Sequence, residues 1–284
     1  MGHGIAQVFA AAGHPVAIYD PAAETLASVP ARISSNLRDL GQSTEPVKLV
    51  RLADSIEDAL VDAEWVIEAA NESLELKQQI FAELDRFAEP HVVLASNSSV
   101  MCVGEIATKA KRRDRIIGTH WWNPPYLVSL VEVIQGADSD PDVVARTLSF
   151  LSGIGRTAVH VRRDIPGFVG NRLQHALWRE AFDLIDRGVC DPETIDLVVK
   201  EGFGRRLAVL GPVENADLIG LDLTLAIHEY VLPSLSAPSQ PSARLRKLVA
   251  EGDLEMRSGR GFRRWTQQQV AATRERVNEA LAKR

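Results

Sequence analysis

Short apolar runs alternate with segments of helical periodicity through the first part of the chain. Each run has four to six residues, is rich in Val and Ile, and is too uniformly apolar for a half-exposed strand. We expect parallel strands, covered on both faces, at 16–20, 65–70, 92–96, 116–120 and 157–161. Helical spacing of apolar residues lies between them, as at 76–87 and 141–151. Strands that alternate with helices predict an α/β fold with a doubly wound sheet.

The pattern changes after residues 162–168, where only helical segments follow. Apolar residues recur with a helical period over 168–187, and Gly188 ends that segment. Asp191 is placed to cap the next helix, 211–232 predicts one long helix, and 266–284 predicts an exposed terminal helix. We therefore expect two domains, an α/β domain over 1–163 and an all-α domain over 164–284.

Charge and composition exclude several classes of function. The net charge is -6, which provides no basic field for nucleic acid or anionic lipid. Cys102 and Cys190 lack a CxxC pattern or nearby histidines at zinc spacing, so neither a disulfide framework nor a metal site is indicated. No apolar run approaches the ~20 residues of a membrane span. We expect small-molecule partners, no nucleic-acid or membrane partner, and a cytoplasmic location.

The first 20 residues resemble a dinucleotide-binding unit after its first strand. Gly2 matches the third glycine of a GxGxxG turn, an alanine-rich helix follows, and a short strand ends at Asp20. A carboxylate at that position accepts hydrogen bonds from ribose hydroxyls and repels a 2′-phosphate, which favours NAD over NADP. The alternative is that Asp20 only caps the turn before Pro21.

The strand before Gly2 and the first two glycines of the turn are missing from the sequence. Removal of a central strand leaves buried hydrogen-bonding groups unpaired, at roughly 1 to 3 kcal/mol each. We therefore expect Met1 to be an internal methionine of a longer reading frame.

Polar side chains follow two further strands at the edge where ligands bind in open α/β sheets. Glu68, Glu72 and Lys77 come at and after the strand 65–70, and Ser99 lies in the stretch 95–100. Glu72 and Lys77 could face the nicotinamide-ribose half of a cofactor. The alternatives are helix capping by Asn71 or Glu72, a solvated lysine, and serines that only cap the next helix.

The segment 118–134, GTHWWNPPYLVSLVEVI, carries the strongest chemical signal. His120 ends a buried strand, and Glu132 lies in the next apolar run, where an unpaired carboxylate is costly. The histidine is the natural partner, and the contact would fix its tautomer for general-base work. A buried structural pair is the alternative. Asn171, near the start of the long helix, could reach a substrate oxygen or could be a helix-start residue without a ligand.

These segments together resemble the L-3-hydroxyacyl-CoA dehydrogenase superfamily over nearly the whole chain. The similarity rests on SNSS, HWWNPP, LVEVI, DIPGFVGNRL and SGRGF, in that order. It implies a Rossmann-like NAD domain, here without its first strand, and a helical domain that binds substrate and forms a homodimer. By the resemblance, His120 is the base, Glu132 orients it, and Ser99 and Asn171 hold the substrate oxygen. The implied NAD contacts are Gly2, Asp20, Glu72, Lys77, Ser99, Asn123 and Arg257, the last where the family often has lysine.

The resemblance leaves the substrate open. The leading hypothesis is NAD-dependent oxidation of an L-3-hydroxyacyl compound to the 3-keto compound, in fatty acid metabolism. Several segments are similar to branches that act on free acids, such as L-gulonate dehydrogenase (lambda-crystallin), L-carnitine dehydrogenase and a pyridine-aldehyde dehydrogenase. The stretch between Asp20 and Trp65 is also shorter than in the fatty-acyl enzymes. Its basic residues, which are the candidates for contacts with coenzyme A, are Arg32, Arg38, Lys48 and Arg51. A catalytically inactive homologue with a structural role is a further alternative.

Overall fold

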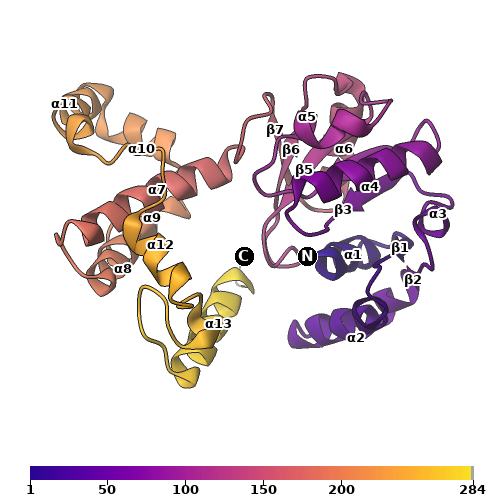
Figure 1. The fold of residues 1–284 in the computed structure, drawn as a ribbon, viewed down its shortest axis with the longest axis horizontal. Coiled ribbons are helices and arrows are strands. Elements are labelled where there is room, and N and C mark those ends of the chain that lie inside the picture. Colours follow the sequence, from indigo (N-terminus) through magenta and orange to yellow (C-terminus); the bar gives the residue numbers. More distant parts are fainter. Residues whose placement is uncertain (283–284) are drawn as a thin grey trace. The chain divides into compact units, whose positions relative to one another are not determined.

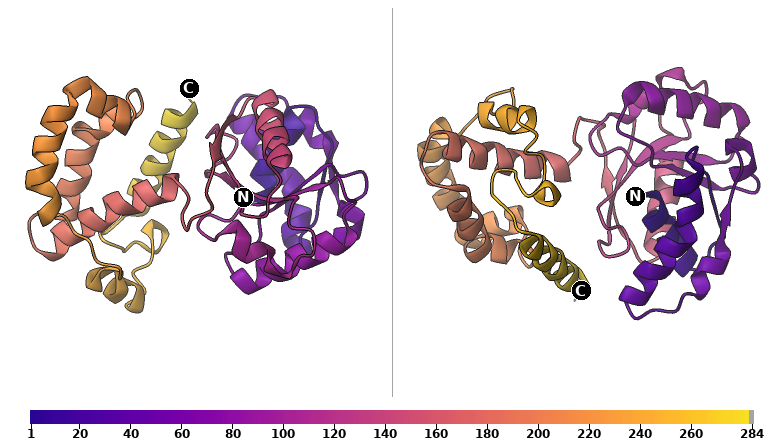
Figure 2. Two further views of the ribbon diagram at one scale, coloured as in Figure 1. Left: turned by 90° about the horizontal axis from the view of Figure 1, so that it is seen from above. Right: turned by 60° about the horizontal axis from the view of Figure 1, so that its bottom comes forward.

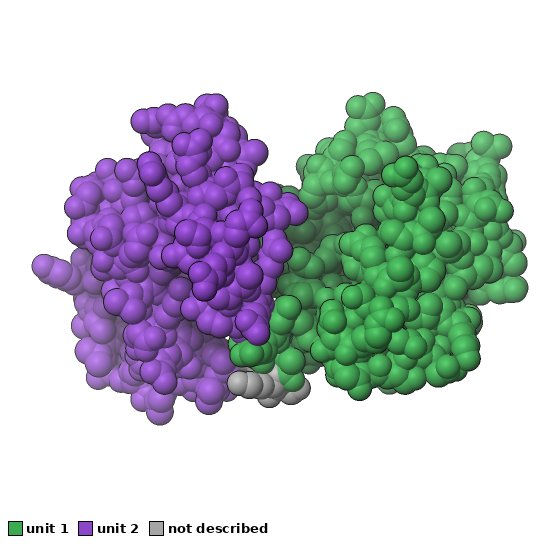
Figure 3. Space-filling model, turned by 90° about the horizontal axis from the view of Figure 1, so that it is seen from below, with its two compact units in different colours: residues 1–172, 278–284 green, residues 173–277 purple. Residues whose placement is uncertain are grey.

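The computed structural model describes residues 1–282 and divides into two compact units (Figure 1, Figure 3). The first unit contains Met1–Arg172 with the C-terminal segment from Asn278, and the second contains Leu173–Val277. The last two residues of the expected C-terminal domain and terminal helix lie outside the described residues.

The first unit has two sheets within the described residues. The larger sheet has the order β3-β4-β5-β6-β7, and the smaller one pairs β1 with β2 in parallel. The strands are β1 (Val16–Ile18), β2 (Val50–Leu52), β3 (Trp65–Glu68), β4 (Val93–Ser96), β5 (Ile116–Trp121), β6 (Leu130–Ile134) and β7 (Thr157–Val161). The strands β3, β4 and β5 are parallel to one another, whereas β6 is antiparallel to β5 and parallel to β7.

Helices cover both faces of the larger sheet (Figure 2). Because successive strand residues point to opposite faces, Leu94 packs with α4 and α5, whereas Val93 packs with α1 and α6. The first unit's helices are α1 (Gly2–Ala11), α2 (Ala23–Asp39), α3 (Ile56–Ala59), α4 (Leu74–Phe87), α5 (Val103–Ile106) and α6 (Pro141–Gly153). The α/β, Rossmann-like doubly wound fold is confirmed, with a break in hydrogen bonding between β1 and β3 among the described residues.

The five expected strands are all present, but two expectations about them were wrong. The sheet is not wholly parallel, since β6 runs against β5. The strand β7 is not covered on both faces, because it lies at the sheet edge and exposes Thr157, Val159 and His160. The strands β2 and β6 add to the expected five.

The second unit is helical. Its helices are the greater part of α7 (Gly170–Asp186), then α8 (Pro192–Glu201), α9 (Gly204–Leu207), α10 (Pro212–Ile219), α11 (Leu221–Val231), α12 (Ala243–Ala250) and most of α13 (Gln267–Ala282). Asp191 caps α8 as expected, with its carboxylate accepting a hydrogen bond from the Thr194 N–H. The single long helix expected over 211–232 was wrong, because Gly220 has φ +100° and separates α10 from α11. No helix among the described residues combines the length and apolar character that a bilayer crossing requires.

Candidate active site

A buried His120–Glu132 pair lies at the carboxyl end of β5. The two residues face each other in the antiparallel register of β5 and β6. The imidazole Nδ1 is 2.8 Å from Glu132 Oε2, and the two residues are only 4% and 1% exposed. The sheet register therefore brings together the acid and the histidine that the sequence predicts as partners.

The second carboxylate oxygen of Glu132 is also held. Oε1 accepts hydrogen bonds from the backbone N–H groups of Val169 and Gly170, each 3.0 Å long, at the start of α7. Burial opposes ionisation of the carboxylate. The bonds from His120, Gly170 and Val169 outweigh that effect and hold the pKa of Glu132 below its ordinary value. Glu132 is thus fixed as an anion at both oxygens.

Gly170 is required by its close approach to an indole. A Cβ at this position would lie 2.4 Å from Trp122 Cζ2, which is shorter than any real contact. The absence of a side chain lets the α7 backbone reach Glu132. Gly170 therefore allows the backbone hydrogen bond that holds Glu132 in place.

The imidazole of His120 lies beside two aromatic rings. Its ring centroid is 5.2 Å from that of Trp122 and 5.8 Å from that of Phe168. Phe168 is 1% exposed and has φ +51°, a left-handed conformation that its packing must maintain. Because Glu132 is anionic, Nδ1 carries the proton, and Nε2 has no hydrogen-bond partner within residues 1–282. The geometry leaves a basic nitrogen for another proton.

Ser99 and Asn171 are brought together. The Asn171 Nδ2 group donates a 2.7 Å hydrogen bond to the backbone carbonyl of Ser99, and both residues are half-buried. This contact uses neither the Ser99 hydroxyl nor the Asn171 Oδ1 atom. The second Nδ2 hydrogen of Asn171 and the Ser99 hydroxyl thus remain as donors for a ligand oxygen.

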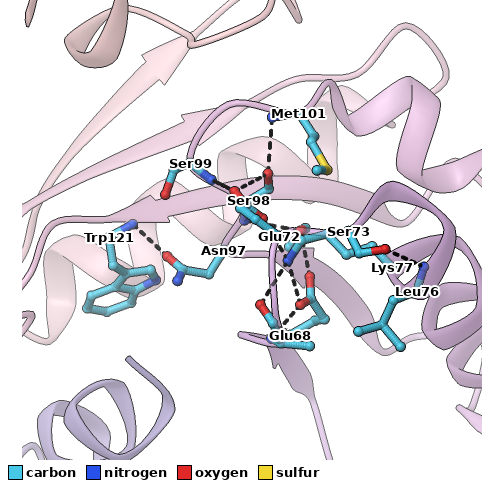
Figure 4. A network of polar contacts seen from close by, with 12 residues as sticks. Glu68, Glu72, Ser73, Leu76, Lys77, Asn97, Ser98, Ser99, Met101 and Trp121 are labelled. Carbon is cyan, nitrogen blue, oxygen red and sulfur yellow. Dashed lines mark hydrogen bonds and ion pairs between the residues drawn. The ribbon is translucent and has the colours of Figure 1, made fainter. Parts of the chain in front are cut away.

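A network of polar contacts connects the ends of β3 and β4 (Figure 4). Glu72 Oε1 accepts hydrogen bonds from the Ser98 hydroxyl at 2.8 Å and the Ser99 N–H at 2.5 Å. Lys77 Nζ lies 3.2 Å from Glu72 Oε2 and 2.8 Å from Glu68 Oε1. Ser73 caps α4, and Lys77 is 1% exposed, so the alternative of a capping Glu72 and a solvated lysine does not describe the structure.

The residues expected to hold the pyrophosphate and adenosine ribose lie at the starts and ends of neighbouring elements. Gly2 begins α1, and a Cβ there would be 4.0 Å from Ala69 Cβ, just after β3. Asp20 is half-buried after β1, and its carboxylate also caps the following turn by accepting a hydrogen bond from the Ala22 N–H. Burial is the main cause that lowers the pKa of His3 to about 4, and the nearby Arg32, a cation close to the start of α1, lowers it further. A helix N-terminus, a cation and a free carboxylate edge fit a dinucleotide.

Asn123 and Arg257 make no hydrogen bond or ion pair with the other predicted site residues among the described residues. Asn123 is exposed two residues after β5, with no side-chain hydrogen bond within residues 1–282. Arg257 belongs to the second unit, where its guanidinium pairs with Glu255 at 2.9 Å. Sequence reasoning missed Asn97, whose Oδ1 accepts the Trp121 N–H at 2.9 Å and connects the end of β4 to β5. The only sequence signal for it was its amide in the stretch 95–100.

Cys102 and Cys190 are free cysteines. Burial first, and then Asp164 and Glu105, raise the pKa of the Cys102 thiol to about 11, which makes it a poor nucleophile. In the part of the chain that the structure describes, no group of three His, Cys, Asp or Glu residues is arranged to hold a metal ion.

Comparisons with known proteins cover both units. Residues 1–165 match the family model described as 3-hydroxyacyl-CoA dehydrogenase, NAD binding domain, and residues 167–265 match its C-terminal domain. A probable 3-hydroxybutyryl-CoA dehydrogenase of Bacillus subtilis is 40% identical over 92% of this chain and 93% of the relative.

A second relative comes from Mesorhizobium japonicum. It is named 5-formyl-3-hydroxy-2-methylpyridine 4-carboxylate 5-dehydrogenase and is 32% identical over 100% of this chain and 94% of the relative. A crystal structure of a 5-formyl-3-hydroxy-2-methylpyridine 4-carboxylic acid 5-dehydrogenase, described as an NAD+ dependent dismutase, has a TM-score of 0.92 at 30% identity. The match covers 99% of this chain and 93% of the other.

Proposed function

Because this chain belongs to the 3-hydroxyacyl-CoA dehydrogenase family of NAD-dependent oxidoreductases, we propose that it oxidises an L-3-hydroxyacyl compound to the 3-keto compound. The observation that carries the proposal is the 2.8 Å contact between His120 Nδ1 and Glu132 Oε2. The contact leaves Nε2 as the proton acceptor, and general-base catalysis of this kind contributes roughly 10² to 10⁴ in rate.

In this proposal, His120 Nε2 removes the proton of the substrate hydroxyl. Glu132 holds the ring in the required tautomer and stabilises the imidazolium that forms. The Ser99 hydroxyl and the Asn171 side chain hold the substrate oxygen as its charge develops. NAD, when bound, accepts the hydride from the carbon that carries that oxygen.

The proposed NAD contacts follow the edge of the sheet. The N-terminus of α1 at Gly2 faces the pyrophosphate, and the Asp20 carboxylate accepts hydrogen bonds from the hydroxyls of the adenosine ribose. The 38% exposed carboxylate of Glu72 faces the second ribose. The remaining proposed contacts are Lys77, Ser99, Asn123 and Arg257.

The oxidation of a free hydroxy acid is a second candidate reaction. It is favoured because basic residues between Asp20 and Trp65 are already paired with carboxylates. Arg51 is engaged by Asp58 through two hydrogen bonds of 2.7 Å, and Lys48 pairs with Glu45 at 2.6 Å. Two of the cations available for coenzyme A phosphates are thus already partnered. The similarity to the pyridine-carboxylate dehydrogenase supports the same candidate.

We also propose that the region 1–163 serves NAD and that 164–284 serves substrate binding and homodimer formation. The second unit exposes many large apolar side chains, including Val209 and Tyr230 at 87% each, which is typical of a surface that a partner covers. A cytoplasmic location, a part in fatty acid metabolism, and the absence of nucleic-acid and membrane partners complete the proposal.

A substrate panel tests the function. The full chain is mixed with NAD and each of L-3-hydroxybutyryl-CoA, free 3-hydroxy acids and L-carnitine, and NADH fluorescence is followed. Turnover of the thioester supports the first reaction, and turnover of a free acid alone supports the second. No NADH with any substrate contradicts both and favours the inactive homologue.

A further inference from the structure

We propose that a cavity beside the second half of α1 binds a small monocarboxylate. The cavity has a volume of about 210 Å³ and lies where α1 meets the segments that follow α2 and α6 and the connection between β5 and β6. It is much larger than the ~15 Å³ that one water molecule needs, and smaller than the roughly 300 Å³ of a pocket for a drug-sized ligand. Of the residues that line it, none belongs to the candidate active site.

Arg156 supplies a cation that no carboxylate of the protein neutralises. The residue is half-buried, burial lowers the pKa of its guanidinium, and it forms no ion pair within residues 1–282. Its Nε atom is buried without a hydrogen-bond partner, and Nη1 donates one long bond of 3.4 Å to the Pro125 carbonyl. Because a half-buried charge without a counterion costs free energy, an anion gains more at this arginine than at an exposed one.

Gln7 adds an oriented donor to the same cavity. The residue is 2% exposed, and its Oε1 atom accepts a 2.9 Å hydrogen bond from Asn36 Nδ2. That bond fixes which end of the amide is the oxygen, so the NH2 group of Gln7 is the end without a hydrogen-bond partner within residues 1–282. The cavity therefore offers a cation and an amide donor, and both suit a carboxylate.

Tyr126 also lines the cavity, and its hydroxyl stays protonated. Burial first, and then the charge of Asp39, raise the pKa of this hydroxyl above its ordinary value. Asp39 is exposed, so solvent screens its repulsion of an anion. The tyrosine thus adds a neutral group that can donate a hydrogen bond.

The remaining wall indicates what the rest of the ligand is like. Aliphatic side chains contribute to it, among them Val8, Leu40 and Ile154. Such a wall suits a short apolar body, whereas a strongly hydrated inorganic anion would lose water there without new hydrogen bonds. A single arginine matches a single negative charge. The class of ligand is therefore a small monocarboxylate with an apolar body.

The cavity shares one segment with the candidate active site. Pro125 and Tyr126 lie in the connection between β5, which carries His120, and β6, which carries Glu132. The same connection lies against α1, since a Cβ on Gly4 would be 2.8 Å from Pro125 Cγ. A carboxylate in the cavity therefore contacts the segment that joins the two members of the His120–Glu132 pair.

Benzoate is the probe for the experiment, and methyl NMR spectra of the full chain locate where it binds. We expect benzoate to shift the methyl signals of Leu40 and Ile154. Benzamide has the same shape without the charge, and it should need a concentration about 10-fold or more higher for the same shifts. Equal shifts with benzamide, shifts with inorganic phosphate but not with benzoate, or no shift at these methyl groups would overturn the proposal.

Arg156→Met removes the cation and keeps an unbranched side chain. We expect benzoate to bind about 10-fold or more weakly, since a charged hydrogen-bond donor is lost. The Tm without benzoate should not fall, because the variant also removes a half-buried charge that has no counterion. The matched control is Arg146→Met, which removes an exposed arginine of α6 outside the cavity and should bind benzoate like the parent chain.

Asn171→Ala tests whether benzoate binds in the candidate active site instead, and it should leave the affinity unchanged. Weaker binding in Asn171→Ala, with parental binding in Arg156→Met, would contradict the proposal. Because benzoate binding is measured without turnover, this result is distinct from failure of the proposed reaction.

Gln7→Glu provides a second variant, should Arg156→Met fail to fold. It keeps the shape of the side chain and the oxygen that accepts the Asn36 bond, but it places a negative charge at the wall of the cavity. We expect benzoate to bind about 10-fold or more weakly through repulsion between like charges, while benzamide binding changes little. Unchanged benzoate affinity in Gln7→Glu would show that the ligand does not enter this cavity.

Discussion

His120 Nδ1 and Glu132 Oε2 lie 2.8 Å apart at directly paired positions of the antiparallel strands β5 and β6. The backbone N–H groups at the start of α7 hold the other oxygen of Glu132. The acid is therefore fixed by two elements distant in sequence, and it in turn fixes the imidazole.

Glu132→Gln should reduce kcat strongly while the protein stays folded. The amide oxygen of the glutamine accepts the two backbone N–H bonds, so its NH2 group faces His120 Nδ1. An NH2 donor at this place favours the imidazole tautomer that is protonated at Nε2. The expected loss is on the order of 10³- to 10⁴-fold, as for the carboxylate of a serine-protease triad. Steady-state kinetics measures it, with exposed Glu105→Gln as the control. A loss below about 10-fold would assign Glu132 a structural role only.

Asn171→Ala should lower kcat by about 100-fold, the cost of losing one donor at a developing oxyanion. It also frees the Ser99 carbonyl, so substrate KM is measured alongside kcat. Neighbouring Arg172→Ala, which loses only a bond to the Pro166 carbonyl, is the control. Similar kinetics for the two variants would count against a role of Asn171 in holding the oxygen.

Gly170→Ala should destabilise the protein by roughly 1 to 3 kcal/mol, because the new methyl group must displace Trp122. Thermal unfolding followed by circular dichroism measures the change in Tm. Gly153→Ala is a matched control, since nothing lies within 4 Å of a Cβ there. Equal Tm values for the two variants would show that the indole moves away without cost.

Acidification should weaken the fold through Glu132. Its pKa is lowered in the folded state, so its contribution to the free energy of unfolding is present above the ordinary value of 4.5 and is lost as pH falls further. In urea titrations, Glu132→Gln should show a shallower fall in stability below pH 4.5 than the parent chain. Parallel curves would mean that Glu132 ionises equally well in the unfolded chain.

The sequence predicts the larger elements because their signals are local. Val93 and Leu94 lie in an apolar run, and that run becomes a strand covered on both faces. The His120–Glu132 contact could be predicted because the two residues lie on neighbouring strands joined by one connection, and a buried carboxylate needs a partner. These features depend on short segments that are close together in the sequence.

Other features depend on the assembled chain. The exposure of Val159 follows from the place of β7 at the sheet edge, which no single strand reveals. The burial of Lys77 depends on its ion pair with Glu68, which lies nine residues earlier at the end of β3. The break at Gly220 needs a positive φ that the apolar period of 211–232 concealed.

The replacement His120→Gln tests the central claim, that this histidine is the base, most directly. Turnover and NADH binding are measured on the same preparation, with exposed His160→Gln on the edge strand as the control. The account predicts that kcat falls by roughly 10² to 10⁴, while NADH affinity stays nearly unchanged and the control keeps its activity. Retained turnover, or loss of NADH binding in place of turnover, would contradict it.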